Sequence, residues 1–350
     1  MKRYYTRACN FYYGDQSKKL VRKKKAIPLN NIKEISFDQI EIITRKSKKK
    51  ICITKIKFLS KSLKAKIETD LKKIKSKKKN FSNFNFKKIP NILGVLNLTP
   101  DSFSDGGKYN TKNRGYKHAI HLFNSGADLV DVGGESTRPG SNAINENLEW
   151  KRISRILKSI RKKVPYSLDT RKSSIMVRGI KSGALLINDV SGLSFDPETI
   201  TVLKKYKTPF VIQHSQGNPK NMQKKPSYKN ELLDIYDFFE KKIKLLRSAG
   251  INHNNIIIDP GIGFGKNLKH NMSLIRNISI FHSLGFPILV GNSRKRFIKE
   301  LAGKNDSKFR IGGTIASSIY LMMQGVNVLR VHDVNELMQG IKIFKKIINN

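Results

Sequence analysis

Eight short apolar runs, each ending in polar or charged residues, constrain the fold of this sequence more than any other feature. The runs occupy residues 92–97, 129–134, 165–169, 185–189, 210–214, 256–259, 288–293 and 328–332. Each run has the length of a strand and is bounded by Gly, Pro or Asn. Continuous apolar runs of this kind are typical of strands that are buried on both faces of a parallel sheet.

Segments with helical spacing of their apolar residues separate the runs, for example at residues 148–162, 232–249 and 272–284. Such an alternation of strands and helices predicts a parallel sheet. The length from residue 90 to the C-terminus matches the roughly 250 residues of a closed eight-stranded barrel. We therefore predict an α/β fold with a (β/α)8 barrel of the TIM type over residues 89–350.

The first quarter of the chain has a different composition, with 28 Lys and Arg against 6 Asp and Glu in residues 1–88. Apolar periodicity predicts strands at residues 35–43 and 51–58 and a basic helix at residues 59–75. Residues 81–86 alternate Phe with Ser or Asn, which indicates a linker or a docking segment. We predict a small basic α+β region over residues 1–88, to which the sequence assigns no role.

The formal net charge of +43 could indicate a nucleic acid or an anionic membrane surface as a partner. However, Lys, Ile and Asn are abundant throughout the chain, and the aromatic residues of the N-terminal region form no base-stacking pattern. Nucleic-acid binding by residues 1–88 is therefore only an alternative hypothesis. No apolar stretch is long enough to span a membrane, no secretory signal is evident, and Cys9 and Cys52 are unclustered. These features predict a cytoplasmic protein without a membrane partner.

Polar side chains follow the apolar runs where a barrel of this kind builds its active site, because all strand C-termini meet at one face. The side chains expected at that face are Asn97, Glu135, Thr137, Asp169, Asn188, His214, Asp259, Lys295, Arg330 and His332. This set suits a ligand with hydrogen-bonding edges at one end and negative charge at the other.

Two glycine-containing loops follow the first two runs. In the first loop, Asn97 could supply a neutral oxygen to Mg²⁺, which takes few protein ligands together with substrate phosphates. The alternative is a turn whose Asn and Asp side chains satisfy backbone groups. In the second loop, Arg138 could fork onto a carboxylate or a phosphate, or it could pair with Glu135.

Asp169, Asn188 and Asp259 end three separate strands. Each alone could cap the following helix. Buried carboxylates without partners are costly, however, so three such residues at one barrel mouth indicate a ligand. Their oxygens suit the N–H and NH₂ groups of a pterin or purine-like ring.

The last two runs end in Ser293 and Lys295 and in Arg330 and His332. Barrels often bind phosphate after their seventh and eighth strands. Arg330 and His332 point to the same side of a strand, so both could reach one diphosphate.

These motifs resemble those of the bacterial dihydropteroate synthases, in the same order and with the same spacing, from residue 92 to the C-terminus. The matching segments are Asn-Leu-Thr-Pro-Asp-Ser-Phe-Ser-Asp-Gly-Gly, Glu-Ser-Thr-Arg-Pro-Gly-Ser, Asp-Pro-Gly-Ile-Gly-Phe-Gly-Lys, Ser-Arg-Lys and Arg-Val-His-Asp. Residues 4–45 look like an N-terminal extension that some bacterial members carry. The resemblance implies that (7,8-dihydropterin-6-yl)methyl diphosphate condenses with 4-aminobenzoate to give 7,8-dihydropteroate and diphosphate, in folate synthesis.

The resemblance also implies roles for individual residues. Those that would hold the pterin are Asp169, Asn188, Asp259 and Lys295. Those around the diphosphate would be Asn97, Thr137, Arg330 and His332, with Asn97 also a ligand of Mg²⁺. Ser293 and the loops around Phe103 and Arg138 would shape the aminobenzoate site, where sulfonamides would compete. Arg330, His332 and Lys295 would take part in catalysis, and the family suggests a homodimer.

Two positions depart from the family pattern. Gln213-His214-Ser215 stands where members commonly have Met-His-Met, and Asn292 replaces a residue that is usually apolar. A related barrel that binds methyltetrahydrofolate and passes its methyl group to a corrinoid protein is an alternative. The Glu-Ser-Thr-Arg-Pro loop, the Ser-Arg-Lys segment and the lack of a cobalamin domain argue against it.

Overall fold

The computed structural model describes residues 3–81, 83–99, 113–136, 140–217, 222, 225–303 and 306–348. Eight parallel strands form one sheet in the order β10-β9-β8-β7-β6-β5-β12-β11. Their bounds are β5 (Asn91–Asn97), β6 (Leu129–Gly133), β7 (Tyr166–Asp169), β8 (Leu186–Asp189), β9 (Phe210–Gln213), β10 (Ile256–Asp259), β11 (Leu289–Val290) and β12 (Val328–Val331). A parallel bridge between Ile258 and Ile288 joins the two ends of the sheet, so the predicted (β/α)8 barrel is confirmed.

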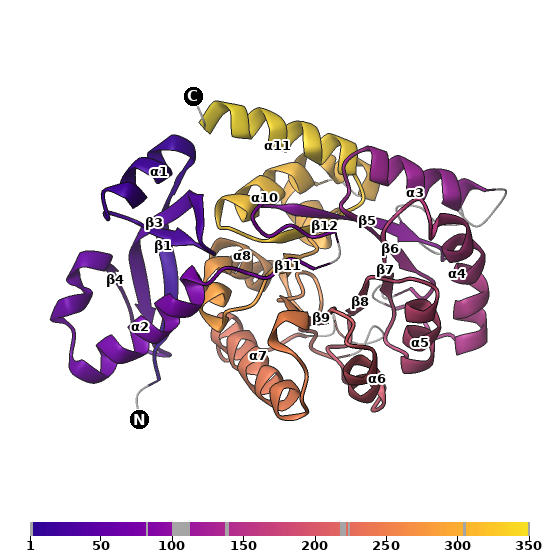
Figure 1. Cartoon of the computed structure of the whole chain (residues 1–350), viewed down its shortest axis with the longest axis horizontal. Coiled ribbons are helices and arrows are strands. Elements are labelled where there is room, and N and C mark those ends of the chain that lie inside the picture. The colour runs from indigo at the N-terminus through magenta and orange to yellow at the C-terminus, as the bar shows by residue number, and fades with distance from the viewer. Residues whose placement is uncertain are drawn as a thin grey trace.

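Helices surround the barrel and bury their apolar faces against its outer surface (Figure 1). They are α3 (Arg114–Asn124), α4 (Glu146–Ile160), α5 (Ser173–Lys181), α6 (Thr199–Tyr206), α7 (Glu231–Ser248), α8 (Leu268–Arg276), α9 (Arg296–Ala302), α10 (Ile311–Met323) and α11 (Val334–Ile348). Short 3₁₀ segments lie at η2 (His253–Asn255), η3 (Ile278–Leu284) and η4 (Ser307–Arg310). Asparagine side chains cap α4, α7 and α8, because each accepts a hydrogen bond from a free backbone N–H of the first turn.

The inside of the barrel changes from apolar to polar along the strands. Side chains alternate across a strand, so every second residue of each strand points into the barrel. The first inward layer is the apolar set Leu93, Leu129, Leu186, Val211, Ile257, Leu289 and Val328. Two residues further along the same strands, the inward positions include Asp131, Asn188, Gln213, Asp259 and Arg330. The polar half of the barrel therefore opens at the C-terminal ends of the strands, where a barrel enzyme binds its substrates.

Two phenylalanines of the segment that precedes the barrel close its N-terminal end. Phe84 and Phe86 are 1% and 2% exposed and pack against the first inward layer of the strands. Asn91 fixes this segment, since its Oδ1 accepts a hydrogen bond from the backbone N–H of Asn85 at 2.9 Å. Residues 81–86 are thus a docking segment, one of the two roles that their sequence predicted.

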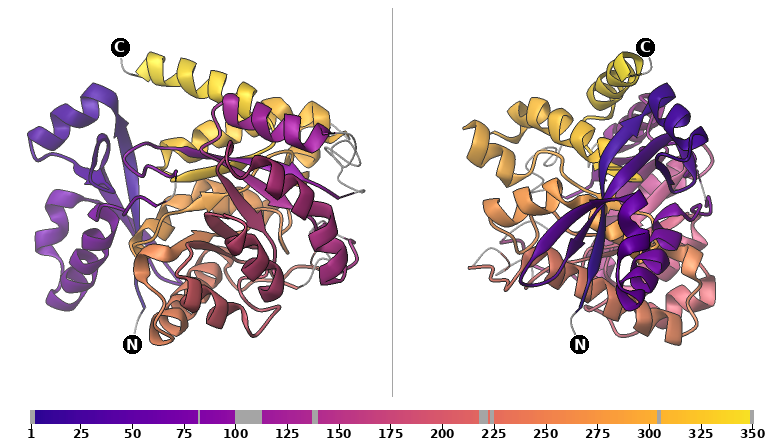
Figure 2. Two further views of the ribbon diagram at one scale, coloured as in Figure 1. Left: turned by 45° about the vertical axis from the view of Figure 1, so that its right-hand side comes forward. Right: turned by 90° about the vertical axis from the view of Figure 1, so that its left-hand side faces the viewer.

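The N-terminal region forms its own sheet beside the barrel (Figures 1 and 2). Its central strand β3 (Ile32–Ile43) pairs antiparallel with β1 (Tyr5–Tyr13), β2 (Ile27–Leu29) and β4 (Lys48–Cys52). The connecting helical elements are α1 (Gly14–Arg22), η1 (Ile53–Phe58) and α2 (Lys61–Lys75). Apolar side chains from β3 and α2, such as Ile40 and Ile67, form a core that is separate from that of the barrel.

Polar contacts fix this region to the barrel on the side of η3 and α10. The hydroxyl of Ser279 in η3 donates to the carbonyl of Ala8 at 2.9 Å, and the hydroxyl of Tyr13 donates to the carbonyl of Met323 at 2.5 Å. The ammonium group of the buried Lys78 donates to the carbonyl of Gly285 at 2.9 Å. Ala8 and Tyr13 of β1, together with Lys78, therefore anchor the N-terminal region to the barrel.

Some local predictions were wrong. The strand predicted at residues 51–58 continues only to Cys52, and η1 takes the rest, because Ile53 and Ile56 stand three residues apart as a 3₁₀ turn requires. Strand β1 and helix α1 were missed, since the pairing of β1 depends on β3, far along the chain. The strand predicted at residues 288–293 shortens to Leu289–Val290.

Within the described residues, no helix is both long and apolar enough to span a bilayer.

Candidate active site

A connected network of charged and polar side chains fills the C-terminal half of the barrel. The guanidinium of Arg330 donates from Nε to Oδ2 of Asp131 at 2.6 Å and from Nη2 to Oδ2 of Asp169 at 2.8 Å. Asp131 also accepts hydrogen bonds from the hydroxyl of Ser167 at 2.5 Å and from Nδ2 of Asn188 at 3.0 Å. These bonds link β6, β7, β8 and β12 across the barrel, so they position the ends of four strands relative to one another.

Two carboxylates, those of Asp131 and Asp169, share the single guanidinium of Arg330 in this network. Burial raises the pKa of Asp169 above its usual range; the neighbouring charge of Asp131 adds to that effect and Arg330 opposes it. Burial likewise raises the pKa of Asp259 to about 6, although a hydrogen bond from the backbone of Gly261 favours its charged form. Ligand groups that donate hydrogen bonds to these carboxylates would stabilise their charged forms.

Three buried polar atoms in the same part of the barrel have no hydrogen-bond partner among the described residues. They are Oδ1 of Asp169, Oδ1 of Asn188 and Nε2 of Gln213. A buried polar group without a partner costs about 1–3 kcal/mol, and such groups are rare in folded proteins. Two acceptors and one amide donor therefore remain for a ligand that itself presents both donors and acceptors.

The polar C-terminal half of the barrel, with the network and the unpartnered atoms of Asp169, Asn188 and Gln213, is called the polar cup below. The loop that follows β10 lies at one side of this cup. Oδ1 of Asp259 accepts a hydrogen bond from the backbone N–H of Gly261 at 2.8 Å. Gly261 has a φ of +70°, and a Cβ at this position would lie 2.0 Å from the carbonyl oxygen of His214, so no other residue fits here. The Nζ of Lys295 lies 4.2 Å from the ring centroid of Phe264 in the same loop.

Residues that follow the last two strands, β11 and β12, contact one another at the other side of the site. The Ser293 hydroxyl lies 3.0 Å from Nδ1 of His332 and accepts a hydrogen bond from its backbone N–H at 3.2 Å. Arg294 is turned away to Asp333, with 2.9 Å between Nε and Oδ2. The predicted residues Ser293, Lys295, Arg330 and His332 thus lie on two adjacent strand ends.

Asn292, which replaces a usually apolar residue, has a structural explanation. Its Nδ2 donates to the hydroxyls of Ser317 at 2.7 Å and of Ser318 at 2.9 Å, both in α10. The amide nitrogen of this side chain is therefore matched by serines of α10, whereas its Oδ1 has no hydrogen-bond partner among the described residues.

Asn97 ends β5 next to the network, at a position that suits a metal ligand shared with a substrate. A Cβ added to Gly133 would lie 3.7 Å from Oδ1 of Asn97 and 3.6 Å from Oδ2 of Asp169, so both oxygens flank this glycine. No three His, Cys, Asp or Glu side chains among the described residues could hold a metal ion by themselves. The side-chain oxygen of Asn97 fits an ion such as Mg²⁺, which takes only one or two protein oxygens beside phosphate oxygens and water.

Two residues that we expected at the barrel mouth have other partners. The Glu135 carboxylate pairs with Arg171 at 2.8 Å and Lys172 at 3.1 Å, and accepts from the backbone of Ile144. Burial alone would raise the pKa of Glu135, but these bonds lower it, so this residue anchors its own loop. The ring of His214 packs edge-on against Phe238 of α7, with 4.9 Å between centroids, outside the network. Glu135 and His214 thus lie outside the hydrogen-bonded network, and their contact with a ligand stays a prediction.

Thr137, Arg138 and Phe103 lie outside the described residues, so their predicted roles stay predictions. Asp131 and Gln213, in contrast, belong to the site and were not predicted to act in it. The signal for Asp131 was present, because an acidic residue in the middle of the apolar run 129–134 needs a buried partner.

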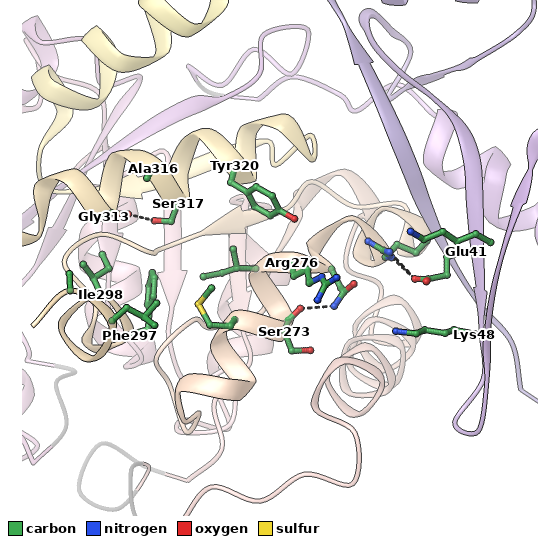
Figure 3. Close-up of a pocket in the computed structure, with 17 residues that line it drawn as sticks. Glu41, Lys48, Ser273, Arg276, Phe297, Ile298, Gly313, Ala316, Ser317 and Tyr320 are labelled. Carbon is green, nitrogen blue, oxygen red and sulfur yellow. Dashed lines mark hydrogen bonds and ion pairs between the residues drawn. The ribbon is translucent and has the colours of Figure 1, made fainter.

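A cavity of about 1110 Å³ lies outside the barrel, between the N-terminal sheet and helices α8, α9 and α10 (Figure 3). Lys48 and Arg276 line its polar side, and Phe297 and Tyr320 line its apolar side. It is on the outer surface of the helices and contains none of the residues of the network. The candidate active site is therefore the polar cup inside the barrel.

The fold and the site together define a (β/α)8-barrel enzyme whose active site binds a polar heterocyclic ring. The sequence model of a family described as pterin binding enzymes matches residues 93–332, and the chain belongs to that family.

Its relatives within the family are dihydropteroate synthases. The chain is 40% identical to the dihydropteroate synthase of Escherichia coli strain K12 over 256 residues, which cover 73% of this chain and 90% of that one. It is similar to the solved dihydropteroate synthase of Yersinia pestis, in a complex with a sulfonamide drug, with a TM-score of 0.73 and 37% identity over 76% of this chain and 96% of that one. The enzyme of Xanthomonas albilineans with 4-aminobenzoic acid gives a TM-score of 0.69 and 34% identity, with 74% and 93% covered.

Proposed function

We propose that this protein is a dihydropteroate synthase, which joins (7,8-dihydropterin-6-yl)methyl diphosphate to 4-aminobenzoate and releases diphosphate. One observation carries this proposal: the buried atoms without partners, Oδ1 of Asp169, Oδ1 of Asn188 and Nε2 of Gln213, stand in one polar cup. A pterin carries an amino group and ring N–H groups beside a carbonyl and ring nitrogens, so it offers donors to the two oxygens and an acceptor to the amide.

The pterin would lie between the strand ends of β7, β8 and β10. Asp169, Asn188 and Asp259 would accept its N–H groups, and the ammonium of Lys295 would interact with its carbonyl edge. Gln213 is polar where the family commonly has Met, and an amide can donate to the ring where a thioether could only pack on it. This difference would alter pterin affinity rather than the reaction.

The diphosphate would lie next to the pterin, over β5 and β12. Arg330 uses Nε and Nη2 for Asp131 and Asp169, so its remaining Nη1 would contact the anion together with His332 and Thr137. The two carboxylates hold the guanidinium plane in place before the substrate binds. Such a preorganised donor needs little rearrangement as charge develops on the leaving group.

Asn97 would hold Mg²⁺ through its Oδ1, and the ion would neutralise charge on the diphosphate when it is bound. The 4-aminobenzoate would bind near Ser293 and the segments around Phe103 and Arg138, where a sulfonamide would compete. Relatives solved with a sulfonamide drug and with 4-aminobenzoic acid support these ligands for this chain.

The reaction needs no side-chain nucleophile. The bond between the pterin methylene carbon and the diphosphate oxygen breaks, and the diphosphate leaves with the electron pair. The cation that remains is stabilised by the electron-rich dihydropterin ring and by the carboxylates of Asp131, Asp169 and Asp259. The amino nitrogen of 4-aminobenzoate then forms the new C–N bond and loses a proton to water or to the diphosphate.

The decisive experiment measures diphosphate release with both substrates and Mg²⁺, and again with each component left out. We expect release that depends on 4-aminobenzoate and stoichiometric formation of dihydropteroate. Absence of release with all components present would refute the proposed function. Methyl transfer from methyltetrahydrofolate to a corrinoid protein, without any release of diphosphate from the two substrates, would favour the alternative barrel chemistry.

The pterin assignment has its own test, the variant Asp169→Asn. It should weaken binding of the pterin diphosphate by about tenfold, since one charged acceptor becomes a neutral amide. Asp189→Asn is a matched control, because Asp189 is also a buried carboxylate at a strand end but binds Ser191 instead of the network. Equal affinity of both variants in an equilibrium titration would remove Asp169 from the pterin site.

The remaining parts of the proposal concern assembly and location. We propose a homodimer, on the family resemblance, and a cytoplasmic protein, on its two free thiols, Cys9 and Cys52. Sedimentation of the purified chain would test the first, and fractionation of cells that express it would test the second.

A further inference from the structure

The N-terminal region contacts helix α7 through an acidic stripe at the start of that helix. Asp234, Asp237 and Glu240 stand three residues apart, so they line one face of α7. Arg45 donates from Nη1 to Asp234 and from Nη2 to Asp237, both at 2.7 Å. Arg45 thus holds Asp234 and Asp237, the two carboxylates nearest the start of α7, at once.

Two further residues of β1 or its flank complete this contact. The Tyr5 hydroxyl donates to Oδ1 of Asp237 at 2.9 Å, and Arg3 forms ion pairs with Asp237 at 2.9 Å and with Glu240 at 2.5 Å. The ring of Tyr5 is buried edge-on against Tyr236, with 5.2 Å between centroids. The contact is therefore anchored by apolar packing as well as by charge.

Hydrogen bonds close the turn that carries Arg45. The hydroxyl oxygen of Thr44 accepts hydrogen bonds from the backbone N–H groups of Lys46 at 3.2 Å and Ser47 at 2.9 Å. The backbone N–H of Thr44 donates to the carbonyl of Ser47 at 2.7 Å. Arg45 is thus presented from a closed turn between β3 and β4.

Asp234, which Arg45 holds, also closes the first turn of α7. Its Oδ2 accepts a hydrogen bond from the backbone N–H of Asn230 at 3.1 Å, and Oδ1 of Asn230 accepts one from Leu233 at 3.0 Å. These reciprocal bonds fix the residue where the loop after β9 enters the helix. Arg45 therefore acts on the end of that loop through one carboxylate.

The end of the loop in turn holds the pterin side of the cup. The hydroxyl of Tyr228 donates to the carbonyl of Gly265 at 2.8 Å, in the loop that begins at Asp259. The side chain of Gln216 exchanges two hydrogen bonds with the backbone of Ser227, at 2.8 and 3.1 Å. The loops after β9 and β10 are thereby tied to the start of α7.

We propose that the N-terminal region is a positioning element for the pterin half of the active site, and that Arg45 is its positioning residue. Through Asp234 and Asp237, Arg45 fixes the start of α7, and α7 fixes the loops that directly follow Gln213 and Asp259. The aminobenzoate would bind near Ser293, beyond β11, and the contact of Arg45 with α7 does not include this part of the barrel. This inference rests on the proposed function.

Steady-state kinetics of the full-length enzyme test it with Arg45→Ala. We expect the KM for the pterin diphosphate to rise at least fivefold, while the KM for 4-aminobenzoate changes less than twofold. Arg45→Lys keeps the charge but reaches only one carboxylate, so its KM should lie between those of Arg45→Ala and the wild type. Lys46→Ala is the matched control, an exposed basic residue of the same turn, and should leave both values unchanged.

Thermal melting of the same samples separates positioning from unfolding. If Arg45→Ala melts below the assay temperature, the inference is tested with Arg45→Lys alone. For the inference to hold, the KM of Arg45→Lys for the pterin diphosphate must exceed that of Lys46→Ala by at least twofold. Equal effects on both KM values, or a pterin KM equal to that of Lys46→Ala, would overturn the inference. Because the wild type must be active in the same assay, its failure would reject the proposed function instead.

Discussion

Asp131 offers the sharpest test of how this active site is held together. It is completely buried, and its two carboxylate oxygens accept from Ser167, Asn188 and Arg330. In Asp131→Ala, the buried donors of Ser167, Asn188 and Arg330 each lose one acceptor. An unsatisfied buried donor costs about 1–3 kcal/mol, so we expect a loss of about 5 kcal/mol in the free energy of unfolding.

Asp131→Asn keeps the shape and separates charge from hydrogen bonding. The amide oxygen can still accept from Arg330 and Asn188, and the amide nitrogen can donate to the hydroxyl of Ser167, which then acts as an acceptor. What is lost is the charge, which makes such bonds roughly twice as strong. We therefore expect a loss of about 2 kcal/mol, less than half of that in Asp131→Ala.

Urea unfolding, followed by the fluorescence of Trp150, the one tryptophan of the sequence, measures both losses. Asp15→Asn is the control, because the side chain of Asp15 is 80% exposed. Turnover should fall in both Asp131 variants, since Arg330 loses one of the carboxylates that orient it. A loss in Asp131→Ala as small as in Asp15→Asn would refute the argument that this network holds the strand ends.

Two further predictions concern the ends of the barrel. Phe84→Ala should lower the free energy of unfolding by about 3–5 kcal/mol, because the ring closes the N-terminal end of the barrel. Phe58→Ala is the control and should have little effect, because Phe58 is 78% exposed. Equal urea midpoints of the two variants would contradict this prediction. At the other end, burial lowers the pKa of Lys266 from 10.5 to about 7. Between these values the unfolded chain binds a proton that the folded chain lacks, so this group makes folding more favourable as the pH rises. From pH 7 to 9 the wild type should gain about 2 kcal/mol relative to Lys266→Met, and a constant difference between their urea unfolding curves would contradict the assignment.

The strand ends were predictable because the information is local. An apolar run of five or six residues predicts a buried strand, and the residue after it lies at the mouth of the barrel. This reasoning found Asp169, Asn188, Asp259 and Arg330 from the sequence alone. Glu135 and His214 have partners outside the network instead, since one or two residues beyond a strand a side chain can turn either inward or to a neighbouring loop.

The pairing of these residues could not be predicted in the same way. Asp131 and Arg330 are 199 residues apart in sequence, and only closure of the barrel brings their side chains within 2.6 Å. The same holds for Arg45 and Asp234, which are separated by 189 residues. In both pairs, the residues around one member do not indicate which distant residue it will contact.

The sequence by itself determined the barrel, its polar mouth and the class of ligand, because strand and helix periods and the residues at strand ends are properties of short segments. Only the tertiary structure decided that Phe84 and Phe86 close the barrel, that Asp131 orients Arg330, and that the N-terminal sheet packs against α7. These contacts depend on which distant surfaces meet, and apolar burial and charge pairing at such surfaces are set once the whole chain has folded.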